Sequence, residues 1–329
     1  MKIFLTGASG FIGGAIAKAL AQDHSLWSMS RSDASDRAIR KLGGGIVRCE
    51  LGNVHASQLT GVDVLIHCAA YVGPWGTQED FWRANVEGVA QLLQAARAAG
   101  VKRFIHMSTE AAFFCGKDLI DIDESRPYPD RNPYYYGASK MESEKIVLAA
   151  NSESFETIVL RPRLVWGPGD TSILPVLKKM VTTKKFLWID GGKAKTSTTN
   201  IHNLVHAVRL TLTRGKGGQA YFITDGEDST LRWFLTAMME TQNIKMPKKS
   251  VSANIARKLA YFVEGFWKTF GLKSEPPLMR FATDLMACEC TVKIDRARSE
   301  LGYLPAISVM QGLAKMKQAY LDGVHQDLH

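Results

Sequence analysis

The sequence lacks the features that mark several classes of protein. None of its apolar runs approaches the ~20 residues that a transmembrane helix needs. Its five cysteines are odd in number, widely separated and without the spacing of a redox pair or of metal ligands. The strand expected at residues 2–5 leaves no room for a signal peptide ahead of it. These absences predict a cytoplasmic protein with free thiols, no transmembrane segment and no metal.

Charge of one sign is in excess, but it is not concentrated. The formal net charge is +9, which taken alone suits a nucleic-acid partner. The 41 lysines and arginines form no long block, however, and short pairs such as Lys178-Lys179 are typical of solvated surfaces. We therefore expect no nucleic-acid partner. The basic surface also suits an anionic cofactor or substrate, or weak contact with a membrane.

Short apolar runs alternate with amphipathic stretches in the first half of the chain. Strands are expected at residues 2–5, 26–29, 45–48, 62–67, 101–107 and 157–160, and helices at 11–21, 81–99 and 134–150. Such alternation predicts an α/β protein with a doubly wound parallel sheet and helices on both faces.

The pattern loosens after residue 163, and a helix at 201–212 and a strand at 219–223 are then expected to return to the sheet. From residue 225 the chain is mostly helical in pattern. We predict two domains. Residues 1–163 plus 199–224 form a dinucleotide-binding domain, and residues 164–198 plus 225–329 form a smaller, mostly helical C-terminal substrate domain.

A glycine-rich turn, T-G-A-S-G-F-I-G, follows the first strand and opens the first helix. Gly7 permits the tight turn, Gly10 lets the backbone approach a pyrophosphate, and Gly13 allows the helix to pack on the strand. The amides at the start of the helix would then hold the phosphates. Three glycines alone also suit a purely structural turn. Their position after the first strand favours cofactor binding by Gly7, Gly10 and their neighbours Ser9, Phe11 and Ile12.

The end of the second strand is expected to select between NAD and NADP. An acid there would bind the ribose hydroxyls, but the chain has Ser30, Arg31 and Ser32 instead. Arg31 could grip a 2′-phosphate with two hydrogen bonds, and the two hydroxyls could donate to it. Asp33 lies close by, and a solvated surface turn is the alternative. The pattern favours NADP over NAD.

Tyr136 and Lys140 lie four residues apart near the start of a predicted helix, and therefore on one face of it. A neighbouring ammonium and the positive nicotinamide of an oxidised cofactor would favour the phenolate and lower the pKa of Tyr136, which could then exchange a proton with a substrate oxygen. Thr109 ends the fifth strand, at the edge where such sheets bind their ligands. We expect Thr109 to hold the reacting oxygen, with Ser108 as the weaker candidate.

In these motifs the chain resembles the extended short-chain dehydrogenases/reductases over nearly its whole length. The matching segments are the glycine turn, A-N-V-E-G at 84–88, Ser108-Thr109, Tyr136 with Lys140, and L-R-P-R-L-V-W-G-P-G at 160–169. The resemblance implies a Rossmann fold for the cofactor domain and a homodimer formed through the helices at 81–99 and 134–150.

The resemblance also implies further contacts with the cofactor. Asn85 would support the active-site helix, and Ser108 would lie at the cofactor. Cys68, Ala69 and Ala70 would line it, Pro162 and Leu164 would border the nicotinamide, and Glu50 and Leu51 would contact adenine. Glu50 departs mildly from the aspartate that many members have there.

Residues 69–76 and 108–111 look most like the 3β-hydroxysteroid dehydrogenase-like branch, which includes 2-alkyl-3-ketoalkanoate reductases. An NAD(P)-dependent oxidoreductase acting on an apolar secondary alcohol or ketone is therefore expected. Tyr71, Trp75, Glu110 and Trp166 are the residues predicted to meet the substrate. The segment 255–272 could line a lipophilic cleft, lie on a membrane surface or form an ordinary core-facing amphipathic helix.

Two other functions are compatible with the motifs. A nucleotide-sugar epimerase would keep NAD tightly bound and return the hydride, and bacterial proteins described only as epimerases/dehydratases look similar. Dehydration is disfavoured because Glu110 is followed by Ala111 and not by a second acid. A cofactor-binding redox sensor is the other alternative, but both Tyr136 and Lys140 are present.

Overall fold

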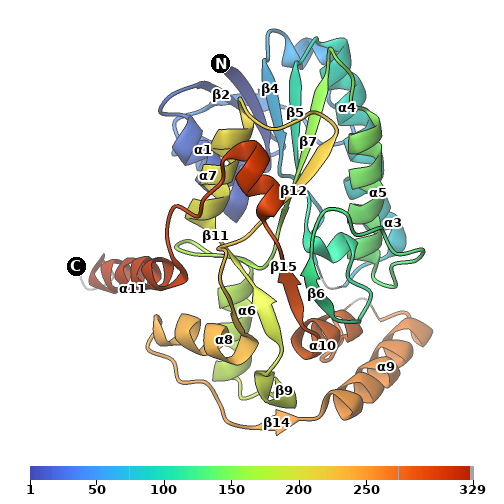
Figure 1. Ribbon diagram of the computed structural model, residues 1–329, viewed down its shortest axis with the longest axis vertical. Helices are drawn as coiled ribbons and strands as arrows, with labels where there is room; N and C mark the ends of the chain where they lie inside the picture. The colour runs from blue at the N-terminus through green and yellow to red at the C-terminus, as the bar shows by residue number, and fades with distance from the viewer. Residues whose placement is uncertain (74, 273, 327–329) are drawn as a thin grey trace.

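A computed structural model describes residues 1–73, 75–272 and 274–326. Its centre is a seven-stranded sheet in the order β12-β7-β5-β4-β1-β2-β3, with every pair parallel (Figure 1). The strands are β1 (Lys2–Thr6), β2 (Ser25–Ser30), β3 (Gly45–Arg48), β4 (Val64–His67), β5 (Arg103–Met107), β7 (Glu156–Pro162) and β12 (Gln219–Ile223). The predicted Rossmann-type parallel sheet is confirmed. Pro74, which is part of the segment 69–76 compared above, and residues 327–329 of the predicted substrate domain lie outside the described residues.

Helices cover both faces of this sheet, which explains why its central strands are apolar on both sides. The helices α1 (Phe11–Leu20) and α7 (Ile201–Thr211) pack together on one face. The helices α4 (Gly88–Ala98) and α5 (Tyr135–Ala149) pack together on the other (Figure 1). The carboxyl edge of the sheet remains for the loops that carry the predicted site.

The strand order reverses direction between β1 and β4. Loops that follow neighbouring strands on either side of such a reversal diverge to opposite faces and leave a crevice at the carboxyl edge. The glycine turn follows β1, and the segment 68–77 follows β4. The topology therefore places the two predicted cofactor segments next to each other.

The helix predicted at 81–99 is not continuous. It consists of α3 (Gln78–Trp82), a π-helical turn η2 (Arg83–Glu87) and α4. The π turn carries Asn85, whose side chain bonds to the backbone of Tyr71 and to Ser139 on α5. Such wider turns are frequent at functional sites, and a periodicity of apolar residues does not reveal them.

The C-terminal region is helical, as predicted, and it also contains a second sheet that the sequence did not indicate. Its helices are α6 (Ile173–Thr182), α8 (Leu231–Glu240), α9 (Ala253–Thr269), α10 (Arg280–Ala287) and α11 (Val309–Gln326). Its sheet has the order β13-β10-β15-β6, formed by Asp228–Thr230, Lys195–Ser197, Cys290–Val292 and Leu119–Ile122. The strand β6 comes from within residues 1–163, so one element of the predicted cofactor domain pairs with the second region. Strands of three or four residues are too short to show an alternating pattern.

Candidate active site

The turn after β1 approaches the segment after β4 more closely than a side chain would permit. Gly7 has φ +78°, and a Cβ on it would lie 2.8 Å from the backbone nitrogen of Ala69. A Cβ on Gly13 would lie 2.2 Å from the carbonyl oxygen of Gly7. The helix α1 begins directly after Gly10 without a side-chain cap, and Ser9 and Gly10 are exposed. The amides at this helix end are suited to hold a phosphate.

Thr6 fixes this arrangement. Its Oγ1 accepts hydrogen bonds from the backbone nitrogens of Cys68, at 3.2 Å, and Ala69, at 3.1 Å. The same oxygen lies 2.7 Å from Nδ1 of His67. One buried threonine therefore joins the ends of β1 and β4 beneath the predicted cofactor crevice.

The residues at the end of β2 differ in whether their side chains could reach a cofactor phosphate. Arg31 is exposed and has no ion-pair partner in the part of the chain that the structure describes. The nearby acid, Asp33, is engaged by Arg48. Ser30 is buried and donates to the carbonyl oxygen of Ser32, whose own Oγ caps the helix α2 (Asp33–Arg40). Arg31 is thus free to meet a phosphate, whereas the donor role predicted for Ser30 does not fit its burial.

Most of the other predicted cofactor residues follow strands at the carboxyl edge of the sheet. Glu50 is exposed after β3, and Leu51 packs on Gly88. Pro162 is buried at the end of β7, and Leu164, with φ +40°, is half-buried just beyond it. Half-buried positions are also occupied by Phe11, Ile12, Cys68, Ala69 and Ala70.

Lys140 lies one helical turn beyond Tyr136 on α5 and is almost fully buried, with 2% of its surface exposed. Its Nζ donates to the carbonyl oxygen of Met107 at 2.7 Å and lies 3.4 Å from Nε2 of His106. Burial disfavours the charged amine and lowers the pKa of Lys140 to about 8, although the carboxylate of Glu144 opposes this shift.

The protein's own groups shift the pKa of Tyr136 in the direction opposite to the one expected for it beside a bound oxidised cofactor. Burial of the hydroxyl raises the pKa of Tyr136 above its ordinary value, and the negative charge of Glu110 raises it further. A hydrogen bond with Thr109 acts in the opposite direction but is the smaller effect. The phenol is therefore held protonated at neutral pH, which makes it a proton donor.

Thr109 and Ser108 point their hydroxyls toward different partners. The Oγ1 of Thr109 accepts from the backbone nitrogen of Ala111 at 3.2 Å and donates to Oε2 of Glu110 at 2.7 Å. The Oγ of Ser108 donates to Oε2 of Glu144 at 2.6 Å, in a buried cluster away from Tyr136. Of the two hydroxyls, only that of Thr109 affects the pKa of Tyr136.

Two of the four predicted substrate residues are committed to the protein interior. The carboxylate of Glu110 forms a buried ion pair with Arg163. Trp166 is 0% exposed, and its Nε1 donates to Oδ2 of Asp225 at 2.9 Å, so a substrate role for Trp166 is contradicted. Its ring packs edge-on against Phe234 in the core of the second region.

The other two predicted substrate residues lie in the segment after β4. Tyr71 is exposed and meets Phe81 edge-on with ring centroids 4.8 Å apart, and Phe81 lies 6.3 Å from the ring of Tyr136. Asn85 holds this segment, because its Oδ1 accepts from the backbone nitrogen of Tyr71 at 2.7 Å. Trp75 is half-buried. Ring contacts through the buried Phe81 therefore link this segment to the predicted catalytic tyrosine.

The contact of His106 with Lys140 was not expected from the sequence. The imidazoles of His67 and His106 are buried and stacked, with ring centroids 5.3 Å apart. Burial lowers the pKa of His67 to about 3, and the pKa of His106 is lowered as well. Alternation along β5 places His106 on the same face as Ser108, which was the available signal.

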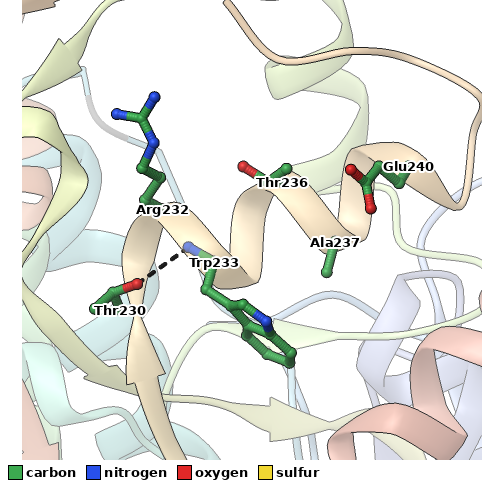
Figure 2. Close-up of a pocket in the computed structure, with 6 residues that line it drawn as sticks. All are labelled: Thr230, Arg232, Trp233, Thr236, Ala237 and Glu240. Carbon is green, nitrogen blue, oxygen red and sulfur yellow. Dashed lines mark hydrogen bonds between the residues drawn. The ribbon is translucent and has the colours of Figure 1, made fainter. Parts of the chain in front are cut away.

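A surface hollow of about 340 Å³ lies along α8 and is separate from these residues. Figure 2 shows the side chains that line it, which are Thr230, Arg232, Trp233, Thr236, Ala237 and Glu240. None of the predicted site residues contributes to this hollow. Among the described residues, no group of three or more histidine, cysteine, aspartate or glutamate side chains is placed to hold a metal ion.

Comparison with known proteins gives concordant results. The family described as "NAD dependent epimerase/dehydratase family" matches residues 3–224. A 4-hydroxy-2-methyl-3-oxo-4-farnesyl-3,4-dihydroquinoline-1-oxide ketoreductase from Stigmatella aurantiaca is 38% identical over 97% of this chain and 96% of its own. A 2-alkyl-3-oxoalkanoate reductase from Stenotrophomonas maltophilia is 31% identical over 96% of this chain and 98% of its own.

A solved structure of a UDP-glucuronic acid 4-epimerase from Bacillus cereus, in complex with NAD, has a TM-score of 0.73 with this chain. The two chains are 21% identical, and the match covers 97% of this chain and 100% of the epimerase. At that identity the likeness shows a shared fold and does not bear on the reaction.

Proposed function

Because the chain belongs to the NAD dependent epimerase/dehydratase family and is an NAD(P)-dependent oxidoreductase of the extended short-chain dehydrogenase/reductase type, we propose that it reduces the carbonyl group of an apolar ketone. The observation that carries the proposal is the half-buried, protonated phenol of Tyr136, which lies one helical turn from Lys140. Both of the curated relatives described above carry the name of a reductase.

Thr109, Tyr136 and Lys140 would have different roles in the reduction. A reduced nicotinamide held at this site would supply the hydride. Thr109 would hold the substrate oxygen, and Tyr136 would donate its proton to that oxygen as charge develops on it. Lys140, whose pKa near about 8 keeps it largely charged at neutral pH, would stabilise the phenolate that remains. The phenol of Tyr136 is protonated at neutral pH and can therefore act as the acid in the direction of reduction.

The residues at the end of β2 favour NADPH over NADH as the cofactor. Arg31 is exposed and unengaged among the described residues, whereas the acid that could disfavour a 2′-phosphate, Asp33, is paired with Arg48. A guanidinium can bind a phosphate through two parallel hydrogen bonds. The exposed Arg31 would therefore meet the 2′-phosphate, and the amides at the start of α1 would meet the pyrophosphate.

An apolar substrate is favoured by the exposed ring of Tyr71, which the buried Phe81 links to the ring of Tyr136. The names of the two relatives point the same way, since one acts on a farnesylated quinoline oxide and the other on alkyl-substituted 3-oxo acids. We propose a bulky ketone with an alkyl or isoprenoid chain as the substrate class.

Epimerisation of a nucleotide sugar is the second candidate, which the family description keeps in view. To separate the two, purified protein is titrated with NADPH and NADH by fluorescence, and NADPH absorbance is then followed with 3-keto steroids and 2-alkyl-3-keto acids. Tighter binding of NADPH and steady consumption with a ketone would support the reductase. Tightly co-purifying NAD without net consumption on any ketone would support the epimerase.

We further propose a cytoplasmic location and a homodimer. All five cysteines are free, as suits a reducing compartment. The helices α4 and α5 lie side by side on the outside of the sheet, where a second copy could pack against them (Figure 1). Light scattering after gel filtration would measure the mass directly.

A further inference from the structure

The helix α9 carries an unusual concentration of exposed apolar side chains. Ile255, Leu259, Phe262 and Phe266 recur at helical spacing along one face, and Phe262 is 72% exposed. The large apolar residues exposed between 253 and 272 are Ile255, Leu259, Tyr261, Phe262, Phe266, Phe270 and Leu272. The opposite face, formed by Ala253, Ala256, Ala260 and Glu264, is the one that the protein buries. This is the reverse of a core-facing amphipathic helix.

The position of α9 leaves this face open. Figure 1 shows the helix at the periphery of the C-terminal region, beside α10. None of the helices in the described part of the chain combines the length and apolar character needed to span a bilayer. The 17-residue α9 also carries Arg257, Lys258 and Lys268. Its apolar stripe could therefore sink into a surface but could not cross it.

The charged residues around the apolar face of α9 indicate which kind of partner this face would bind. Residues 245–272 contain six basic residues and one acidic residue. That acid, Glu264, is buried, and its Oε1 accepts from the backbone nitrogen of Arg280 at 2.6 Å. The exposed lysines of the segment are Lys245, Lys248, Lys249, Lys258 and Lys268. A second copy would bring the same positive charge against this one, whereas an anionic lipid surface complements it.

We propose that α9 docks the protein on anionic membranes. The stripe from Ile255 to Phe270 inserts between the headgroups, and Lys245, Lys248, Lys249 and Lys258 contact lipid phosphates. Insertion buries apolar area, and lysine contacts add an attraction that salt weakens. Tyr261 would lie at the headgroup level, where amphipathic rings are favoured.

Contacts inside the protein join the docking helix to the active-site helix. Arg257 on α9 donates to Oδ1 of Asp284 at 2.7 Å, and the hydroxyl of Tyr134 donates to Oδ2 of the same carboxylate at 2.6 Å. Lys268 lies 5.7 Å from the ring centroid of Tyr135. Docking would therefore bring the start of α5, with Tyr136, close to the bilayer. The consequence that apolar ketones enter from the membrane rests on the proposed function, whereas the docking itself does not.

Vesicle flotation tests the proposal directly. The full-length protein is mixed with phosphatidylcholine vesicles with or without phosphatidylglycerol, and the bound fraction is measured at low and high salt. We expect binding to the anionic vesicles only. The double variant Phe262→Ser/Phe266→Ser should lower the partition coefficient about tenfold or more, because less apolar area is buried. Leu304→Ser/Met310→Ser is the matched control, since those side chains are 65% and 63% exposed elsewhere on the molecule.

The control should bind like the unmodified protein, and both variants should retain turnover of a water-soluble ketone. Three results would overturn the proposal: no binding to either vesicle, equal binding by the two double variants, or a dimer that only Phe262→Ser/Phe266→Ser dissociates while vesicles capture nothing. Because flotation requires no turnover, its failure can be distinguished from failure of the proposed reductase activity.

Discussion

The carboxyl edge of the seven-stranded sheet and the outer face of α9 depart from ordinary protein surfaces in opposite ways. At the sheet edge, charged and polar groups such as Lys140, Glu144 and Arg163 are buried among partners. On α9, apolar groups such as Phe262 are left in the open. Burying a charge and exposing a large apolar side chain are both unfavourable, so each points to something beyond folding. We propose that the first region carries the chemistry and that the second contacts a membrane.

The largest expected effect removes the proton donor from the sheet edge. Tyr136→Phe should lower kcat by about 10²–10⁴-fold, the usual contribution of a positioned acid, because the ring remains but the transferable proton is lost. Tyr135→Phe is the matched control, since that neighbouring ring is exposed. Equal activity of the two variants would remove Tyr136 from the mechanism. Ketone-dependent oxidation of NADPH is the measurement.

The next effect concerns the exposed arginine at the end of β2. Arg31→Ala should weaken NADPH binding by about 10–100-fold, the range expected for losing charge-assisted hydrogen bonds to a phosphate, and should leave NADH binding nearly unchanged. Arg37→Ala, on the exposed side of α2, serves as the control. Fluorescence titration measures both affinities. A parallel loss for NADH would show that Arg31 does not recognise the 2′-phosphate.

Acid should destabilise the sheet edge through its buried imidazoles. The folded-state pKa of His67 is about 3, so between pH 6.5 and 3 the unfolded chain binds a proton that the folded one does not. Stability is therefore present above pH 6.5 and is lost as the pH falls, by about 1.4 kcal/mol per pH unit for each such histidine. The pKa of His106 is lowered too, and it adds a loss of the same sign.

Denaturant unfolding between pH 7.5 and 5 would measure that slope. His106→Phe should make it shallower, whereas His24→Gln, in the turn before β2, should not. A slope that His106→Phe leaves unchanged would mean that the imidazole of His106 does not resist protonation in the folded state.

The smallest effect is expected on α9. Phe262→Ser/Phe266→Ser should change the free energy of unfolding by about 0.5 kcal/mol or less, because exposed side chains contribute little to folding. A loss of several kcal/mol would show that these rings pack within the protein. The outer face of α9 would then not differ from the sheet edge by leaving apolar side chains exposed. Thermal unfolding at neutral pH is sufficient to measure it.

Local features of the chain could be predicted well. The glycine turn, with Tyr136 and Lys140 on one helix, depends on neighbours within a few residues, and the sequence shows their spacing directly. The parallel sheet followed from the alternation of strands and helices.

Features that join distant segments could not be predicted. The sheet that pairs β6 with β15 links residues about 170 positions apart, and its strands are too short to show a pattern. The burial of Trp166 depends on Asp225 and Phe234, and the contact of Lys140 with His106 depends on the packing of α5 on β5. The pKa of Tyr136 was expected to fall because the adjacent lysine was visible in the sequence but the burial was not.

The central claim is that hydride passes from NADPH to a ketone and remains in the product. Incubating the protein with an apolar ketone and NADPH deuterated at the transferable position, followed by mass spectrometry of the product, tests it most directly. The account predicts an alcohol that carries one deuterium, formed in equal amount to the NADPH consumed. An unlabelled product with no net loss of NADPH would contradict it and would identify chemistry that returns the hydride to its own substrate.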